Sequence, residues 1–145
     1  MATVRANDIL LVEDSPGDAR LAREAFFEAE STNQLHWVND GVEAIHFLRR
    51  EGRHAAAPRP DLILLDLNLP RKDGREVLAE IKGDAELRRI PVVVLTTSQS
   101  QDDIQRAYSL NANCYITKPV VLEDFIRVAR TIQEFWLEIV QLPGR

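Results

Sequence analysis

The 145-residue chain carries 18 lysines and arginines against 23 aspartates and glutamates, which gives a formal net charge of −5. This length suits one domain with a proper core and leaves little for a second, so we expect a single domain over residues 1–145. The acidic balance argues against a nucleic-acid binder, which would show a basic patch, and the lack of an apolar run of about 18 residues argues against a membrane span.

Short apolar runs alternate along the chain with segments of helical periodicity. We expect strands at 8–12, 35–38, 62–65, 92–95 and 114–117. We expect helices at about 16–30, 41–51, 74–83, 101–110 and 121–140. Strand-then-helix order with short crossovers is typical of a parallel sheet covered on both faces. The pattern fits the compact flavodoxin-like, doubly wound α/β fold, with a five-stranded parallel sheet in the order 2-1-3-4-5 and five helices, the last one extended.

The pattern Asp-Gly-x-Glu occurs twice, at Asp40 to Glu43 and at Asp73 to Glu76. In each copy an aspartate that can cap a helix is followed three residues later by a glutamate that can reach back to it, as in a capping box. The two copies therefore predict where the second and third helices begin.

The apolar run 62–65 leads directly into Asp66, with Asn68 two residues later and Pro70 closing the stretch. Consecutive aliphatic residues indicate a strand that is buried on both faces. A carboxylate at the end of a central strand lies where open α/β sheets bind ligands, and burial there is costly unless something pairs with it. Taken alone, Asp66 could also be an aspartate that caps a turn.

Other strand ends supply groups that could pair with this acid. Glu13 and Asp14 follow the first strand, Thr96 follows the fourth and Lys118 follows the fifth. Crowded carboxylates repel one another unless a cation joins them, and hard oxygen ligands suit Mg²⁺. A lysine offers positive charge to a phosphoryl oxygen. Taken singly, each residue could be a cap, a turn or a surface charge, but together they predict phosphoryl transfer onto an aspartate.

These motifs resemble those of the receiver domain of two-component response regulators. Leu11-Val12-Glu13-Asp14 is similar to the acidic pair after the first strand of that family. The stretch from Leu64 to Pro70, followed by Asp73-Gly74, is similar to its phosphorylated strand end. Leu95-Thr96 and Lys118-Pro119 are similar to its switch hydroxyl and its lysine with the following proline.

The resemblance, which covers about residues 8–130, implies a role for each residue of the site. Asp66 would accept a phosphoryl group from a histidine kinase. Asp14, Asp66 and the carbonyl group of Asn68 would bind Mg²⁺, with Glu13 helping through water. The chain would then be a signalling protein and not an enzyme, beyond promoting its own phosphorylation and dephosphorylation.

The same resemblance implies a conformational switch. Lys118 and Thr96 would bind the phosphoryl group, and the movement of Thr96 would open space for Tyr115 to rotate inward. The Lys118–Pro119 bond would be cis. Thr97 stands where the family usually has a small alanine or glycine, and we expect it to tune the lifetime of the phosphate.

The apolar residues of the last helix form two stripes. In one stripe the apolar residues recur at spacings of four and three, as they do in the seam of a coiled coil. One stripe can cover the sheet, whereas the other would be exposed, and an exposed apolar patch usually marks an interface. We expect residues 131–145 to extend this helix and to form a homodimer. The alternative is a tail that folds back on its own domain. The expected interface residues are Phe125, Ile132, Phe135, Trp136 and Ile139.

The expected partners are therefore other proteins. The tail and the loop before Asp61 resemble those of the small stand-alone regulators that partner bacterial phytochrome histidine kinases, so we expect such a kinase and a second copy of the chain, with no nucleic acid and no membrane. Residues 1–8 lack the apolar core of a signal peptide. The single cysteine, Cys114, suits a reducing compartment, which predicts a cytoplasmic location.

Three other functions are compatible with parts of the pattern. A phosphatase of the haloacid dehalogenase type also uses an aspartate and Mg²⁺, but it requires a second acid where this chain has Asn68. A flavodoxin-type binding module would need a glycine-rich phosphate loop, whereas Glu13 and Asp14 would repel a phosphate there. A receiver that no longer signals through phosphate would not need the full set of acids, Thr96 and Lys118.

Overall fold

Five parallel strands form the centre of the protein, in the order β2-β1-β3-β4-β5. The computed structural model describes residues 7–29 and 33–135. The strands are β1 (Asp8–Val12), β2 (Gln34–Val38), β3 (Leu62–Leu65), β4 (Val92–Thr96) and β5 (Cys114–Thr117). The predicted flavodoxin-like strand order and the edge position of β2 are confirmed.

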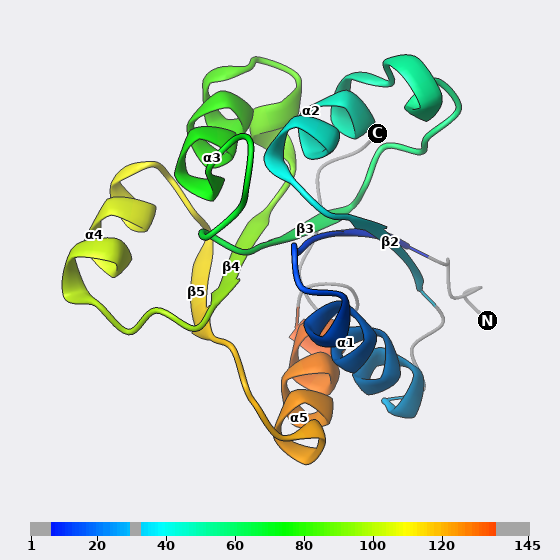
Figure 1. Ribbon diagram of the computed structural model, residues 1–145, viewed down its shortest axis with the longest axis vertical. Coiled ribbons are helices and arrows are strands. Elements are labelled where there is room, and N and C mark those ends of the chain that lie inside the picture. Colours follow the sequence, from blue (N-terminus) through cyan, green and yellow to red (C-terminus); the bar gives the residue numbers. More distant parts are fainter. Residues whose placement is uncertain (1–6, 30–32, 136–145) are drawn as a thin grey trace.

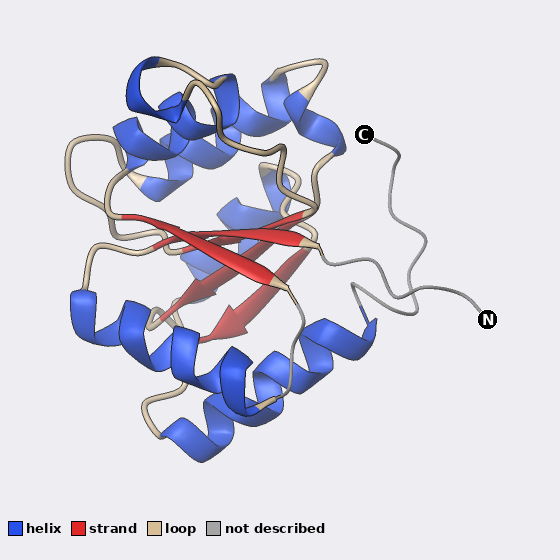
Figure 2. Ribbon diagram, turned by 90° about the vertical axis from the view of Figure 1, so that its right-hand side faces the viewer, coloured by secondary structure: helices blue, strands red, loops and turns tan. Residues whose placement is uncertain are grey.

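Helices cover both faces of the sheet, as Figure 1 shows with labels and Figure 2 shows from the side. They are α1 (Pro16–Glu28), α2 (Gly41–Arg49), α3 (Gly74–Gly83), α4 (Gln101–Ser109) and α5 (Leu122–Ile132), with single 3-10 turns at Gly52–His54 and Leu87–Arg89. α1 and α5 pack together on one face, and α2, α3 and α4 lie on the other. In the part of the chain that the structure describes, no helix is long and apolar enough to cross a membrane.

Successive residues of the central strands contribute to opposite cores. In β1, Leu10 and Val12 join the core beneath α2, α3 and α4, whereas Ile9 and Leu11 join the core beneath α1 and α5. All four side chains are at most 3% exposed. A strand that has helices on both of its faces must be apolar at every position, which explains the unbroken runs in the sequence.

Two residues of the predicted coiled-coil seam, Phe125 and Ile132, pack against the protein's own sheet. Phe125 and Ile132 are each 1% exposed and belong to the core shared with α1. The prediction that these two residues form a dimer interface is therefore wrong. A spacing of four and three only says that one face of the helix is apolar, and it does not say what that face covers.

The structure describes the end of α5 only as far as residue 135, so the predicted extension of this helix beyond that point lies outside the described residues. The α-helix ends at Ile132, and residues 133–135 form a wider, π-type turn. Phe135 retains 49% of its surface exposed. Trp136 and Ile139, the other predicted interface residues, lie outside the described residues.

Side-chain caps determine where the first four helices begin. Asp40 caps α2 and Asp73 caps α3, as predicted. Glu43 does not complete the capping box, because its carboxylate is engaged by His54 at 2.7 Å and by Arg53 at 3.0 Å. The caps, each accepting from a backbone N–H of its helix, are Ser15, Asp40, Asp73 and Ser100.

Two glycines allow the loop after Asp66 to pack closely against its surroundings. A Cβ atom on Gly74 would lie 2.2 Å from the carbonyl oxygen of Asp66, and one on Gly41 would lie 2.0 Å from the carbonyl oxygen of Lys72. The N–H of Gly74 also donates to the carbonyl oxygen of Leu67 at 2.9 Å. The loop between β3 and α3 is thus held by backbone contact with the first turns of α2 and α3.

Replacing Gly74 with alanine should therefore destabilise the protein. We expect Gly74→Ala to lower the free energy of unfolding by about 1–3 kcal/mol, since an added methyl group here meets backbone that cannot rotate away. The measurement is urea denaturation. Gly83→Ala, at the other end of α3, is the control: a Cβ there meets nothing within 4 Å, and the change should be neutral or stabilise by up to about 1 kcal/mol. Equal losses in the two variants would contradict the close approach.

Candidate functional site

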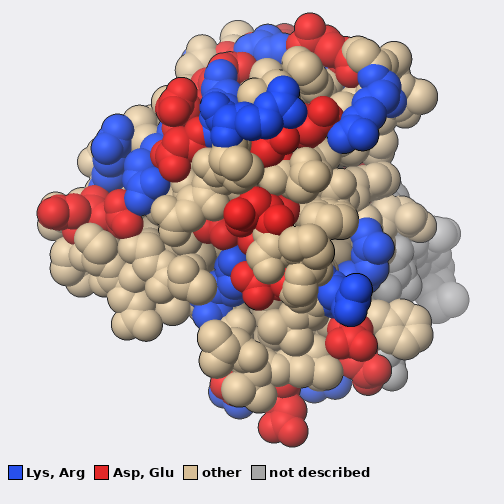
Figure 3. All heavy atoms as spheres, viewed as in Figure 1, with Lys and Arg blue, Asp and Glu red and all other residues tan. Residues whose placement is uncertain are grey.

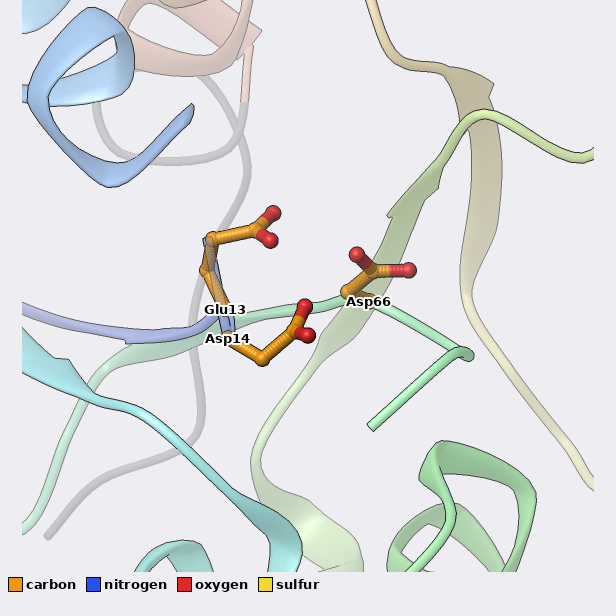
Figure 4. Close-up of side chains that lie close together, drawn as sticks. All are labelled: Glu13, Asp14 and Asp66. Atoms are coloured by element: carbon orange, nitrogen blue, oxygen red, sulfur yellow. The ribbon is translucent and has the colours of Figure 1, made fainter. Parts of the chain in front are cut away.

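The carboxyl ends of β1 and β3 bring three acids together. Glu13 and Asp14 follow β1 and Asp66 follows β3, and Figure 4 shows the three side chains close together, with that of Asp14 reaching toward Asp66. One carboxylate oxygen of each residue lies within 4.8 Å of the others. Glu13 and Asp66 are buried, whereas Asp14 is exposed. In Figure 3, acidic atoms reach the surface near the middle of this face.

Lys118 is the cation of this cluster. It follows β5, and its backbone N–H donates to the carbonyl oxygen of Thr96 at 2.7 Å. Its ammonium group donates to Glu13 Oε2 at 2.5 Å, to Asp66 Oδ2 at 3.0 Å and to Asp18 Oδ2 at 3.1 Å. An ammonium group has three N–H bonds, so all of its donors are matched by carboxylates.

Burial and pairing act in opposite directions on the charges of this cluster. Burial raises the pKa of Glu13 to about 7, and the hydrogen bond from Lys118 offsets only part of this effect. Burial alone would lower the pKa of Lys118, but the hydrogen bond to Glu13 and the charge of Asp66 outweigh it, so the pKa is raised. The ammonium group therefore stays charged, and it faces more acidic groups than one lysine can neutralise.

The donor set suits a divalent metal ion. Carboxylate oxygens are hard ligands, and the exposed carboxylate of Asp14 can be reached from solvent. The N–H of Asn68 donates to Asp66 Oδ1 at 3.1 Å, which places Asn68 at the same edge of the sheet. The carbonyl group of Asn68 stays a predicted ligand.

Thr96 ends β4 with a hydroxyl group that has no partner. The residue is fully buried, and among the described residues its Oγ1 is the buried side-chain polar atom that lacks a hydrogen bond. Leaving such a group unsatisfied costs about 1–3 kcal/mol. The hydroxyl is thus free for an acceptor that enters the site, in keeping with the role predicted for Thr96.

Side chains tie the loop after Thr96 to its neighbours. Ser98 Oγ donates to Asp103 at 2.6 Å, and Arg75 Nη2 donates to the same carboxylate at 2.5 Å. The hydrogen bonds from Ser98 and then from Arg75 hold the pKa of Asp103 below its ordinary value. The hydroxyl group of Tyr115 donates to the carbonyl oxygen of Ser98 at 2.9 Å. The loop is therefore bonded to Asp103 on α4, which Arg75 links to α3, and to Tyr115 on β5.

Two details at the rim of the site concern sequence predictions. All peptide bonds of the described residues are trans, so the prediction of a cis bond between Lys118 and Pro119 is wrong. The trans isomer is intrinsically favoured by about 0.5–1 kcal/mol, and Lys118 makes all of its contacts in that form. Thr97 is exposed next to the buried Thr96, and its effect on phosphate lifetime stays a prediction.

The chain matches the sequence profile of the response regulator receiver domain over residues 9–130. It belongs to this family. The matched region of the receiver domain includes every strand end that contributes to the cluster, from Glu13 to Lys118. Membership in the family favours the receiver over the phosphatase and flavodoxin-type alternatives.

Similar proteins include receivers of phytochrome systems. Response regulator Rcp1 of Synechocystis sp. is 53% identical over 136 residues, which are 94% of this chain and 92% of Rcp1. The crystal structure of the phosphorylated cyanobacterial phytochrome response regulator RcpA is 53% identical with a TM-score of 0.91, covering 97% of this chain and 100% of that one. The structure of Mn²⁺-bound Rcp1 is 51% identical with a TM-score of 0.87, covering 95% and 99% of the two chains.

Two features of this receiver domain were not predicted. Asp18, in the first turn of α1, contacts Lys118. The sequence feature that could have indicated this contact is that α1 begins just after the acidic pair Glu13-Asp14. The bridge from Arg75 to Asp103 joins α3 to α4, and no pattern within either helix indicates it. Both features depend on how separate segments are placed in space.

The unpartnered hydroxyl of Thr96 leads to a stability prediction. Thr96→Val should leave the free energy of unfolding unchanged or raise it by up to about 1 kcal/mol, because it replaces an unsatisfied polar group with an apolar one. Urea denaturation measures the change. Ser15→Ala is the control: the Ser15 hydroxyl accepts from the N–H of Asp18 at 3.2 Å, and its loss should cost about 1 kcal/mol. Similar losses in both variants would mean that the Thr96 hydroxyl is bonded.

Proposed function

We propose that Asp66 accepts a phosphoryl group from a histidine kinase and that the protein signals through the resulting change in its protein contacts. The observation that carries this proposal is the pairing of the buried Asp66 with the buried ammonium group of Lys118, at 3.0 Å. A carboxylate in that position is a nucleophile held beside a fixed positive charge. Phosphoryl transfer depends mainly on such positioning and charge neutralisation.

The transfer needs one bond to form and one to break. An oxygen of Asp66 bonds to phosphorus while the bond from phosphorus to the histidine nitrogen of the kinase breaks, and that nitrogen keeps the electron pair. The N–H that Lys118 now donates to Asp66 is then available to a phosphoryl oxygen. The unpartnered hydroxyl of Thr96 donates to another.

We propose that Mg²⁺ is bound by Asp14, Asp66 and the carbonyl group of Asn68, with Glu13 helping through water. The clustered carboxylate oxygens of the three acids support this site. In addition, Rcp1, whose structure is 51% identical in sequence to this chain, has been crystallised with Mn²⁺. When bound, the ion would neutralise charge on the transferred phosphoryl group. Mg²⁺ is usually held by one or two carboxylates and by phosphate oxygens, which fits the exposed position of Asp14.

Tyr115 and the loop after Thr96 are proposed to carry the change to the surface. A phosphoryl group adds nearly two negative charges and strong acceptors, which draw the Thr96 hydroxyl toward Asp66. The Tyr115 hydroxyl is bonded to Ser98 two residues after Thr96, so a movement of this loop reaches β5 directly. Thr97, in the same loop, is proposed to tune how long the phosphate persists.

The kinase is proposed to be a bacterial phytochrome. RcpA is by name a phytochrome response regulator, and a 34% identical structure with a TM-score of 0.90 belongs to red light signalling in R. palustris. These relatives cover almost the whole chain, which supports a partner of the same kind.

We also propose that a second copy of the chain binds at the end of α5. Phe135 is 49% exposed there, and a large exposed aromatic side chain is typical of an interface anchor. Trp136 and Ile139 remain predicted members of this interface, and residues 131–145 its predicted segment. Phe125 and Ile132 are excluded because they are buried in the core.

Intact-protein mass spectrometry tests the phosphorylation. Incubation with Mg²⁺ and acetyl phosphate should add one phosphoryl group, and EDTA should prevent it. Asp66→Asn should abolish the adduct completely, because an amide oxygen is a poor nucleophile. Asp102→Asn, at an exposed acid on α4, is the control and should keep the adduct. An adduct that persists in Asp66→Asn, or none in the unmodified protein, would refute the proposal.

Light scattering tests the proposed dimer. At about 100 μM, well above the micromolar range of moderate complexes, the protein should have the mass of two chains, and Phe135→Glu should reduce it to one. Phe27→Glu changes an aromatic side chain that is 78% exposed on α1, and this control should leave the dimer intact. A single-chain mass for the unmodified protein, with and without a beryllofluoride mimic of the phosphate, would rule the dimer out.

A further inference from the structure

The ammonium group of Lys118 is shared among three carboxylates that differ greatly in exposure. The side chains of Glu13 and Asp66 are 4% and 7% exposed, whereas that of Asp18 is 41% exposed. Asp18 is also the most distant of the three, at 3.1 Å. Exposed ion pairs contribute little, because water competes with them. Asp18 is therefore the partner that Lys118 can release most easily.

Releasing either buried partner would be more costly. Glu13 without Lys118 would be a buried carboxylate without its cation, which is strongly destabilising. Asp18, in contrast, keeps contact with water, and it lies in the first turn of α1, where its N–H donates to Ser15 Oγ. The positive end of the helix dipole stabilises a carboxylate there.

A phosphoryl group on Asp66 changes what Lys118 must satisfy. Phosphorylation converts the Asp66 carboxylate into an acyl phosphate, so the carboxyl group loses its own charge and the N–H that it accepts from Lys118 can pass to one phosphoryl oxygen. The group has three acceptor oxygens, but the ammonium group has only three donors, and Glu13 retains one. Among the three N–H groups of Lys118, only the one that Asp18 now accepts is left for a second phosphoryl oxygen.

We propose that Asp18 is a positioning residue that competes with the phosphoryl group for Lys118. This competition weakens the binding of a phosphoryl mimic at the site and shortens the lifetime of the phosphoryl group on Asp66. The proposal rests on the proposed function of Asp66. Removal of the Asp18 charge leaves more of the Lys118 charge for the phosphoryl group. Asp18, in the first turn of α1, thus adjusts the phosphoryl chemistry of Asp66 at the end of β3.

A titration with beryllofluoride in Mg²⁺ tests the proposal. The readout is tryptophan fluorescence, since the indole N–H of Trp37 donates to the carbonyl oxygen of Glu13 at 2.7 Å. Asp18→Asn should bind the mimic about two- to fivefold more tightly, which corresponds to the loss of one partly exposed ion pair. The half-life of the phosphoryl group that acetyl phosphate transfers to Asp66 should lengthen by a similar factor. Asp18→Glu, which keeps the charge, should restore the original values.

Glu24→Gln is the matched control, because it removes the same charge from an exposed position on the same helix. It should change neither affinity nor half-life. Unchanged or weaker binding in Asp18→Asn would overturn the role of Asp18, and so would an equal gain in Glu24→Gln, which would indicate a general charge effect. A lower urea midpoint without tighter binding would assign Asp18 to stability alone. If the unmodified protein bound no beryllofluoride, the proposed function itself would fail.

Discussion

The structure around the site depends on one buried cation. Lys118 donates to acids that follow β1 and β3 and to one on α1, so a single side chain joins three segments that are far apart in the sequence. Without it, the burial of Glu13 and Asp66 would carry the full cost of two unpaired charges. Pairing keeps these acids in place while leaving an excess of negative charge at the sheet edge. The same interaction therefore both permits the cluster and leaves it with negative charge that a further cation could neutralise.

The strand order explains why these groups can meet. In a parallel sheet all strands end at one edge, and the order β2-β1-β3-β4-β5 places the acid-bearing β1 and β3 next to each other. β4 and β5 follow, and they bring the Thr96 hydroxyl and the lysine from the other side. The residues of the central strands β1, β3 and β4 are almost all apolar, because helices cover both faces. The polar side chains of the site, Glu13, Asp66, Thr96 and Lys118, thus lie where these strands and β5 stop.

Much of this arrangement could be predicted from the sequence, because strand ends and helix caps are marked locally. The runs ending at Asp66 and Thr96, and the caps Asp40 and Asp73, were all found from adjacent residues. The burial of Phe125 and Ile132 could not be, because an apolar helix face looks the same whether it covers the protein's own sheet or a second chain. The contact of Asp18 with Lys118 spans 100 positions, and only the folded chain brings these residues together.

The two loops beside Asp66 are held in different ways. The loop that follows it is held by backbone, with Gly41 and Gly74 in contact with main-chain atoms. The loop after Thr96 is held by side-chain hydrogen bonds of Ser98 and Tyr115. A side-chain hydrogen bond contributes about 1 kcal/mol, whereas the backbone contacts yield only if a whole helix shifts. The molecule is therefore held differently on the two sides of its central acid, so we expect a charge added there to be resisted on the side of α2 and α3 and to displace the side of α4 and β5.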